Sequence, residues 1–338
     1  MQRRCVLTLT GVLFLYCLAP LSAQPSVRIG SVVFADYFYK LGGDSVGLPA
    51  QYAPYREHTG LFQFRRVQLW AESFFGAGFS ARVLLEANDL SLDAQRRYSP
   101  FLKEVSLTWD SLALDQLQLQ AGLIPTPTWR LSEALWSYRS LEKTVTDFWG
   151  WGSAVDFGVA LRARSETSNQ RVFQALLMLG SGEGVRAESN SQKKLYAECF
   201  AQPLPGFWLE AYADWESRAP REHILQFKGL LGYQHASFSA GGELLLRSQH
   251  RADTVTTPLG LSLFGHWQLA QTPSVRLVLR YDWVKRENSP ASVHHFGLVA
   301  IDYAPIPQVH CMPNLWLLGR KALRPQIVPR ITLFVRSP

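Results

Sequence analysis

Arg65 and Arg66 are adjacent in the sequence, and two guanidinium groups so close together suggest a site that binds anions. Adjacent like charges repel, so the pair is costly unless a bound anion or neighbouring acids compensate it. A guanidinium group offers paired donors in a planar fork, which suits a phosphate or a carboxylate. The pair therefore predicts contact with anions, and a salt bridge inside the fold is the alternative.

A second group of charged residues lies in residues 123–154, a stretch without regular alternation. Its charged residues have both signs: Arg130, Arg139 and Lys143, with Glu133, Glu142 and Asp147. It is also rich in tryptophan, and aromatic rings give a loop apolar area to pack against a wall while its charges face water. Ser132, followed by helix-forming residues, is the predicted N-cap of a short helix.

No catalytic constellation accompanies these charges. His294 and His295 are the only adjacent histidines, and in a strand their side chains point to opposite faces. The run GSGEG at 180–184 lacks the Gly-Lys-Ser/Thr ending of a phosphate loop, and no Gly-x-Ser-x-Gly or His-Glu-x-x-His occurs. We therefore expect no enzyme, no metal site and no cofactor.

The elements that position the charged residues are short segments of alternating character. In residues 79–87, for example, Phe79, Val83 and Leu85 share one face while Arg82 and Glu86 share the other. We predict about sixteen strands, at 27–39, 61–74, 79–87, 101–109, 114–121, 155–163, 171–180, 194–201, 207–215, 223–234, 238–247, 259–269, 275–284, 293–303, 308–317 and 327–336.

The lengths of the connections between these strands alternate. Short connections near 75–78, 202–206 and 270–274 are separated by long ones near 40–60, 88–100 and 123–154. Outer-membrane barrels have short periplasmic turns and longer external loops, whereas a β-sandwich has no reason to alternate in this way. The chain is therefore predicted to be an all-β, transmembrane antiparallel barrel.

Residues 123–154 are then the third and longest external loop. A barrel of this size leaves a wide aqueous channel unless something narrows it, and we expect this loop to fold into the lumen. The alternative is an external loop stabilised by its own aromatic residues. Alternation places further charges on the lumen wall: Arg82, Glu86, Glu104, Arg162, Arg164, Glu210, Asp214, Glu243, Arg247, Arg276, Arg280, Asp282 and Arg330.

The N-terminus predicts export. Residues 1–23 combine two arginines, an apolar run and the small-residue site Leu21-Ser22-Ala23, as in a secretory signal peptide. Removing them lowers the formal charge from +7 to +5. This mildly basic balance, without runs of like charge, argues against a nucleic-acid partner. Residues 24–338 are predicted to be one domain, and Cys199 and Cys311 are too few for a disulfide framework.

Three segments resemble the porins grouped with the phosphate-selective porins O and P: RRVQLWAE at 65–72, EALWSYRSLEKTVTDFWGWGSAVDFGV at 133–159 and AIDYAPIPQVHCMPNLW at 300–316. With the barrel spacing, the resemblance covers nearly the whole exported chain. It implies a sixteen-stranded, trimeric outer-membrane channel with the third loop inside. It also implies that Arg65 and Arg66 face the constriction and that Arg139 belongs to the aromatic-arginine block of that loop.

The sequence departs from this family in two respects. It has few lysines and no basic cluster that would trap phosphate, so phosphate selectivity is not expected. Such barrels usually end on an aromatic residue, whereas here Phe334 is followed by four more residues.

The sequence thus predicts a passive outer-membrane channel for small hydrophilic solutes, in contact with outer-membrane lipid and mildly selective for anions. Arg65, Arg66, Arg82, Arg130, Arg139 and Lys143 are the predicted anion-contacting residues, and Glu133, Glu142 and Asp147 are the acids of the constriction loop. One alternative is a non-conducting barrel that acts as a surface-binding or structural protein. Another is a soluble exported β-protein that binds carbohydrate through its tryptophans and is extracted without detergent.

Overall fold

The structure is a computed structural model that describes residues 26–45, 51–112, 116–166, 171–289, 292–321 and 323–337. The predicted signal peptide at 1–23 and the first two residues of the strand predicted at 114–121 lie outside these ranges.

Each of the sixteen predicted segments contains a strand of the structure. The first half of the sheet consists of β1 (Ser26–Tyr39), β2 (Gly60–Gly76), β3 (Phe79–Asn88), β4 (Phe101–Asp110), β5 (Leu117–Pro125), β6 (Val155–Glu166), β7 (Val172–Gly180) and β8 (Lys194–Gln202). The second half consists of β9 (Phe207–Ala219), β10 (Glu222–Gln234), β11 (Phe238–Arg251), β12 (Thr254–Thr256), β13 (Leu259–Ala270), β14 (Ser274–Lys285), β15 (Val293–Ile306), β16 (Val309–Arg320) and β17 (Gln326–Arg336).

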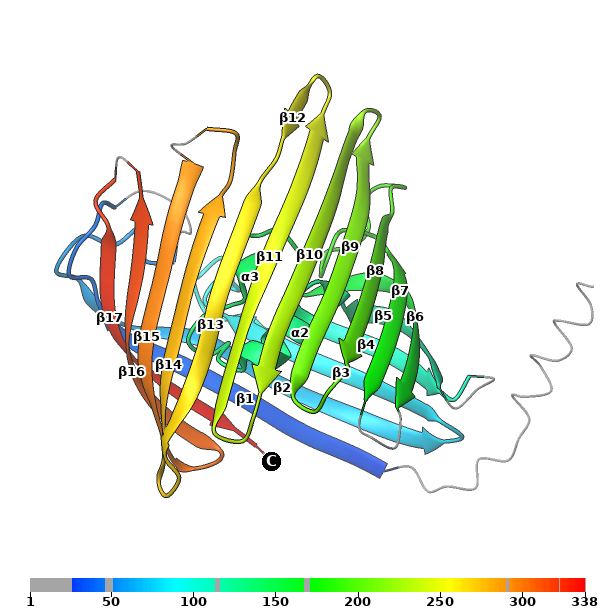
Figure 1. Ribbon diagram of the computed structural model, residues 1–338, viewed down its shortest axis with the longest axis horizontal. Helices are drawn as coiled ribbons and strands as arrows, with labels where there is room; N and C mark the ends of the chain where they lie inside the picture. Colours follow the sequence, from blue (N-terminus) through cyan, green and yellow to red (C-terminus); the bar gives the residue numbers. More distant parts are fainter. Residues whose placement is uncertain are drawn as a thin grey trace, which may run out of the picture.

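The sheet closes on itself because β1 pairs antiparallel with both β2 and β17. Phe38 lies opposite Leu61 on one side and Arg330 on the other. The short β12 only extends the hairpin that β11 begins, and β11 pairs directly with β13. In the described ranges the wall is therefore an antiparallel barrel of sixteen strands, which confirms the predicted fold class (Figure 1).

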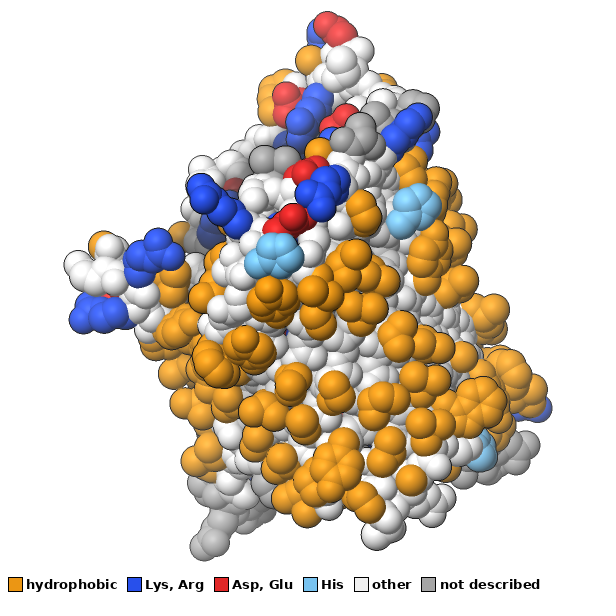
Figure 2. Space-filling view, turned by 90° about the vertical axis from the view of Figure 1, so that its left-hand side faces the viewer, with side chains coloured by type: hydrophobic (Ala, Val, Ile, Leu, Met, Phe, Trp, Pro, Cys, Tyr) orange, Lys and Arg blue, Asp and Glu red, His pale blue; other side chains and the backbone are white. Residues whose placement is uncertain are grey.

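The two faces of the wall have opposite chemistry, as the period of two requires. Leu177, Leu231 and Trp267 are exposed on the outer face, whereas charged side chains such as Glu198 and Lys228 are buried on the inner face. Figure 2 shows the apolar side chains spread over the side of the barrel, below a cap of charged residues. The outer surface is thus apolar over most of its height.

The two ends of the barrel differ in their connections. At one end, called the turn end here, the connections are short, such as 203–206, 235–237 and 271–273. At the other, the loop end, most are longer, although β9 and β10 are joined there by residues 220 and 221 alone. The predicted alternation is therefore present, except here and at the loop-end connection 321–325, which is no longer than the turn-end connection 111–116.

The longest connection, residues 126–154 between β5 and β6, contains both helices of the described chain, α2 (Pro127–Trp136) and α3 (Val145–Phe148). The predicted N-cap at Ser132 is wrong: Thr126 is the N-cap, and Pro127 begins the helix with a φ that suits its first turn. Ser132 instead lies inside α2, buried, where its hydroxyl accepts a hydrogen bond from Lys228. Neither helix is long and apolar enough to cross a membrane.

Residues 126–154, called the connecting segment from here on, form a buried apolar core with inward side chains of the wall. Trp136 packs against Phe264 of β13 with 5.5 Å between ring centroids, and Phe148 packs against Phe296 of β15 at 5.0 Å. The cluster also includes Leu245 of β11 and Trp316 of β16. On this side of the barrel the interior is therefore packed with apolar side chains.

Candidate functional site

Hydrogen bonds from the neighbouring strands β10 and β11 and from the more distant β17 hold the connecting segment in place. Lys228 of β10 donates to the carbonyl of Thr128 at 2.7 Å, and Arg247 of β11 donates to that of Trp151 at 2.7 Å. Arg330 of β17 donates to the carbonyl of Leu141 at 3.0 Å. Because these wall residues are buried and come from three strands, the backbone of the segment is fixed at several points along its length.

A cavity of about 500 Å³ lies between the opposite side of the connecting segment and strands β1 to β4. We call it the basic cavity because six of its lining residues are cationic and only Glu104 and Glu133 are acidic. The cationic residues are Arg66, Arg82, Lys103, Arg130, Arg139 and Arg336. The structure thus brings four of the six predicted anion-contacting residues together around one space.

Arg65 and Arg66 occupy a β-bulge of β2. Phe34 lies opposite Arg66 and Ala35 lies opposite Phe64, so Arg65 is the extra residue. Such a bulge lets two successive side chains turn to the same face, and both guanidiniums are buried on the inner side. The bulge lies where the alternation of apolar residues changes phase, between Phe64 and Val67.

The two arginines nevertheless have different surroundings. Arg65 lies 2.7 Å from Asp36 and 3.8 Å from Glu142, and it does not line the basic cavity. Arg66 lines the cavity and lies 3.5 Å from Glu86. Arg65 therefore connects the wall to the connecting segment, whereas Arg66 presents its charge to the cavity.

Lys103 is a member of this site that sequence reasoning missed. Strict alternation places it on the apolar outer face of β4, but a second bulge pairs Leu84 with Glu104 and Leu85 with Leu102, which turns Lys103 inward. Its ammonium group lies 3.7 Å from Glu86, the carboxylate that Arg66 also approaches. The signal in the sequence was a single charge that interrupts an apolar face.

At the basic cavity, the two cations Arg66 and Lys103 share one acid, Glu86, which leaves positive charge uncompensated.

On the connecting segment, Arg139 lies between two acids. Its guanidinium is 2.6 Å from both Glu133 and Asp147, and it stands over the ring of Trp129. Burial raises the pKa of Glu133, although Arg139 opposes part of this effect. Burial acts on Asp147 in the same direction, but Arg139 and Lys143 outweigh it and hold the pKa of that carboxyl below its usual range.

The other predicted residues divide between the cavity and the anchors of the segment. Arg82 pairs with Glu104 at 3.0 Å and Arg130 pairs with Glu198 at 2.7 Å, both at the cavity. Lys143, Glu142 and Asp147 do not line it. Lys143 is 3.9 Å from Asp147, and Glu142 is fully buried.

The remaining sequence motifs are accounted for by the fold. His294 is buried while His295 faces outward, as predicted for adjacent residues of a strand. In the glycine-rich run, the backbone amides of Gly182 and Gly184 donate to Asp156, so the run forms a turn around a carboxylate. Within the described ranges, no three His, Cys, Asp or Glu side chains are grouped to hold a metal ion, and Cys199 and Cys311 are free.

Comparison with known proteins finds similarity in structure only. No family model matches the chain, and no curated protein matches its sequence. Among solved structures, an anion-selective porin from Comamonas acidovorans is 11% identical over 93% of this chain and 100% of its own, with a TM-score of 0.64. OmpF from Salmonella typhi, solved with daunomycin, is 9% identical over 92% and 97%, with a TM-score of 0.67. OmpT of Vibrio cholerae is 10% identical over 94% and 99%, with a TM-score of 0.65.

These similarities extend over whole chains, so this protein has the fold of outer-membrane β-barrels. At such low identity the likeness concerns the fold alone. The resemblance to the phosphate-selective porins O and P is thus supported only as far as a porin-like barrel.

Proposed function

We propose that this protein is an outer-membrane channel through which small hydrophilic solutes diffuse passively. The observation that carries the proposal is the basic cavity beside the connecting segment, inside a barrel with an apolar outer face. An apolar band on closed strands suits a hydrocarbon environment, and a polar interior suits solute passage. The connecting segment, anchored by Lys228, Arg247 and Arg330, narrows the lumen to the side of β1 to β4.

The proposed channel prefers anions mildly. Six cations and two acids line the basic cavity, and Glu86 serves both Arg66 and Lys103. Pores select ions by the charge sign of the side chains that line them. Arg82, Arg130 and Arg139 are paired with acids, so the anion preference depends only on the positive charge that these acids do not compensate. We therefore expect a weak anion preference.

This function places the barrel in the outer membrane of a Gram-negative type of cell, exported by its signal peptide and in contact with lipid. It acts without a cofactor or nucleic acid, and we expect a homotrimer.

The test is single-channel conductance of the refolded protein in a planar bilayer, with the reversal potential measured across a potassium chloride gradient. We expect a steady conductance and a reversal potential of the sign for anions. A reversal potential of the opposite sign would overturn the anion preference alone. A protein that inserts and shows the heat-dependent mobility of a folded barrel but conducts no ions would favour a surface-binding or structural role, since the connecting segment would then close the lumen.

A further inference from the structure

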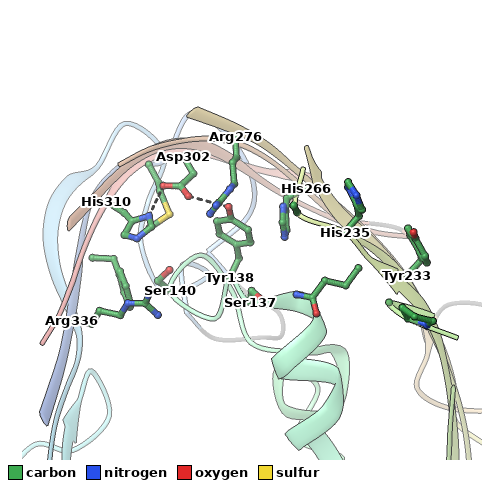
Figure 3. A pocket seen from close by; sticks show the side chains of 16 residues that line it. Ser137, Tyr138, Ser140, Tyr233, His235, His266, Arg276, Asp302, His310 and Arg336 are labelled. Carbon is green, nitrogen blue, oxygen red and sulfur yellow. Dashed lines mark hydrogen bonds and ion pairs between the residues drawn. The ribbon is translucent and has the colours of Figure 1, made fainter. Parts of the chain in front are cut away.

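A second and larger cavity, of about 740 Å³, opens at the turn end of the barrel. We call it the turn-end basin. It is lined by β10, by β13 to β17, by the turns at 203–206 and 235–237 and by the tip of the connecting segment. Figure 3 shows His266, Arg276 and Tyr138 projecting into it. Its volume falls in the range of sites for small organic molecules.

Both oxygens of Asp302, the acid of the basin, have a neighbour within hydrogen-bond distance. Asp302 of β15 is buried, and one of its oxygens lies 2.7 Å from Nδ1 of His310 while the other accepts a hydrogen bond of 3.0 Å from the Tyr138 hydroxyl. Figure 3 shows both contacts as dashed lines. Both oxygens of Asp302 are therefore occupied within the protein, and among the lining residues this carboxylate is one acid against the two arginines Arg276 and Arg336.

The arginines of the basin, in contrast, have no acidic partner. In the part of the chain that the structure describes, no carboxylate lies within 4.0 Å of the guanidinium nitrogens of Arg276 or Arg336. Arg276 donates through Nε to the neutral amide of Gln268 at 2.8 Å, which leaves its charge uncompensated. This distinguishes both arginines from Arg66, Arg82 and Arg139, each of which lies within reach of an acid.

An imidazole next to Arg276 adds an independent observation. Nδ1 of His266 is buried and lacks a hydrogen-bond partner among the described residues. A buried polar atom without a partner is costly, and one that faces a polar cavity is satisfied when a ligand enters. As the N–H tautomer, this nitrogen can donate to an oxygen.

We propose that the turn-end basin binds the carboxylate or phosphate group of a small organic anion, with Arg276 and Arg336 as the charged donors and His266 as a further partner. Planar guanidinium groups hold such oxyanions by paired hydrogen bonds. The size of the basin favours an organic anion over an inorganic ion, and the rings of Tyr138 and Phe334 offer apolar contact to its carbon skeleton. Only the biological role of this site rests on the proposed channel function. In that role, the site would bind small organic anions transiently as they diffuse through the channel.

The test is isothermal titration calorimetry of the full exported chain, folded in detergent micelles at low salt, with succinate and glycerol 3-phosphate as probes and glycerol as the neutral control. We expect one or both anions to bind and glycerol not to bind. Preference between the two anions distinguishes a carboxylate site from a phosphate site. Failure of both anions to bind the unaltered protein would overturn the proposal.

Variants locate the site. Arg276→Gln removes a charge-assisted contact, and we expect it to weaken binding about tenfold. Arg336→Gln, at an exposed position, gives a second test that does not depend on β14 folding correctly. Because Arg336 lines both cavities, whereas Arg276 lines the basin and not the basic cavity, Arg276→Gln decides between the two. Arg251→Gln removes the same charge at the loop end and should leave the affinity unchanged. Equal weakening by Arg276→Gln and Arg251→Gln, or loss of binding only in Arg66→Gln, would overturn the proposal.

Binding in micelles does not require conduction, so the two proposals fail separately. A protein that binds succinate but does not conduct ions overturns the channel and retains the basin. A conducting protein that binds neither probe overturns the basin alone.

Discussion

The indole nitrogen of Trp316 lies 2.9 Å from Oε2 of Glu142, and both side chains are buried. Trp316 belongs to β16, whereas the guanidinium of Arg65, 3.8 Å from Oε1 of the same carboxylate, belongs to β2. One carboxylate of the connecting segment is thus held by strands on both sides of the point where the barrel closes. Glu142 therefore ties the connecting segment to the wall on both sides of this closure.

Replacing Glu142 by alanine should destabilise the barrel. The substitution leaves the Trp316 N–H without a partner and leaves Arg65 with Asp36 as its remaining acidic partner. Breaking such a buried arrangement costs about 3 kcal/mol. The free energy of unfolding, measured in lipid vesicles by guanidinium titration with tryptophan fluorescence, checks this. Glu188→Ala is the control, since Glu188 pairs with Lys193 at an exposed position and should change stability by less than about 0.5 kcal/mol. Equal losses in the two variants would mean that Glu142 is not an anchor.

Replacing Lys103 by glutamine should weaken the anion preference. A unit charge about 4 Å from an ion path in water lowers the energy of an anion by about 1 kcal/mol and raises that of a cation by the same amount. Removing it should therefore lower the anion to cation permeability ratio by at least about fivefold. The reversal potential across a salt gradient measures this ratio. Lys193→Gln removes the same charge from an exposed connection and should leave the ratio unaltered. An unchanged ratio in Lys103→Gln would remove this residue from the ion path.

The barrel could be predicted from the sequence because its two requirements are local. An apolar outer face imposes alternation on every strand, and the two ends impose alternating connection lengths. Bulges are less local, because one extra residue in one strand shifts the register against its neighbour. At Arg65 the shift of phase is visible in the chain, but at Lys103 only an isolated charge marks it.

The details of the site depend on contacts between distant segments. Ser132 is a good N-cap residue by type, but it lies inside α2 because Pro127 begins the helix and Lys228 binds the serine hydroxyl. Similarly, Glu86 lies near Arg66 and Lys103 because of the register in which β2, β3 and β4 pair. The sequence pattern does not predict this register. The turn-end basin draws its residues from several strands, so its unpaired arginines are visible only in the folded chain.

The anion preference should increase as the pH is lowered. Burial raises the pKa of Glu133 despite Arg139, so this acid loses its charge at a higher pH than an ordinary glutamate. The pKa of Asp147 is held low, so Asp147 keeps its charge. Protonation of Glu133 therefore makes the basic cavity more positive. Reversal potentials recorded as the pH is lowered from about 7 to about 4 should show this step at a higher pH than that of an ordinary glutamate.

The matched variant for this titration is Glu133→Gln, which removes the carboxylate but keeps the shape of the side chain. We expect its permeability ratio at pH 7 to resemble that of the unaltered protein at low pH, without the step. A step of the same size in both proteins would assign the titration to another group.

Cys199 reports whether the outer face of the barrel is in lipid. Its side chain is exposed on β8, between Ala175 of β7 and Ala211 of β9, on the same face as the exposed Leu195. A thiol in hydrocarbon does not ionise and does not meet charged reagents, and thiolate is the reactive form. In a Cys311→Ser background in vesicles, we expect Cys199 to react with neither a small apolar maleimide nor a sulfonated methanethiosulfonate, and with both once the barrel is unfolded by heating in sodium dodecyl sulfate. Ser189→Cys, made in a background with both native cysteines replaced by serine, places a thiol on an exposed connection and should react with both reagents. If the charged reagent labelled Cys199 as fast as Cys at position 189, the outer face of the barrel would be in contact with water. The proposal that the barrel spans a membrane would then be overturned.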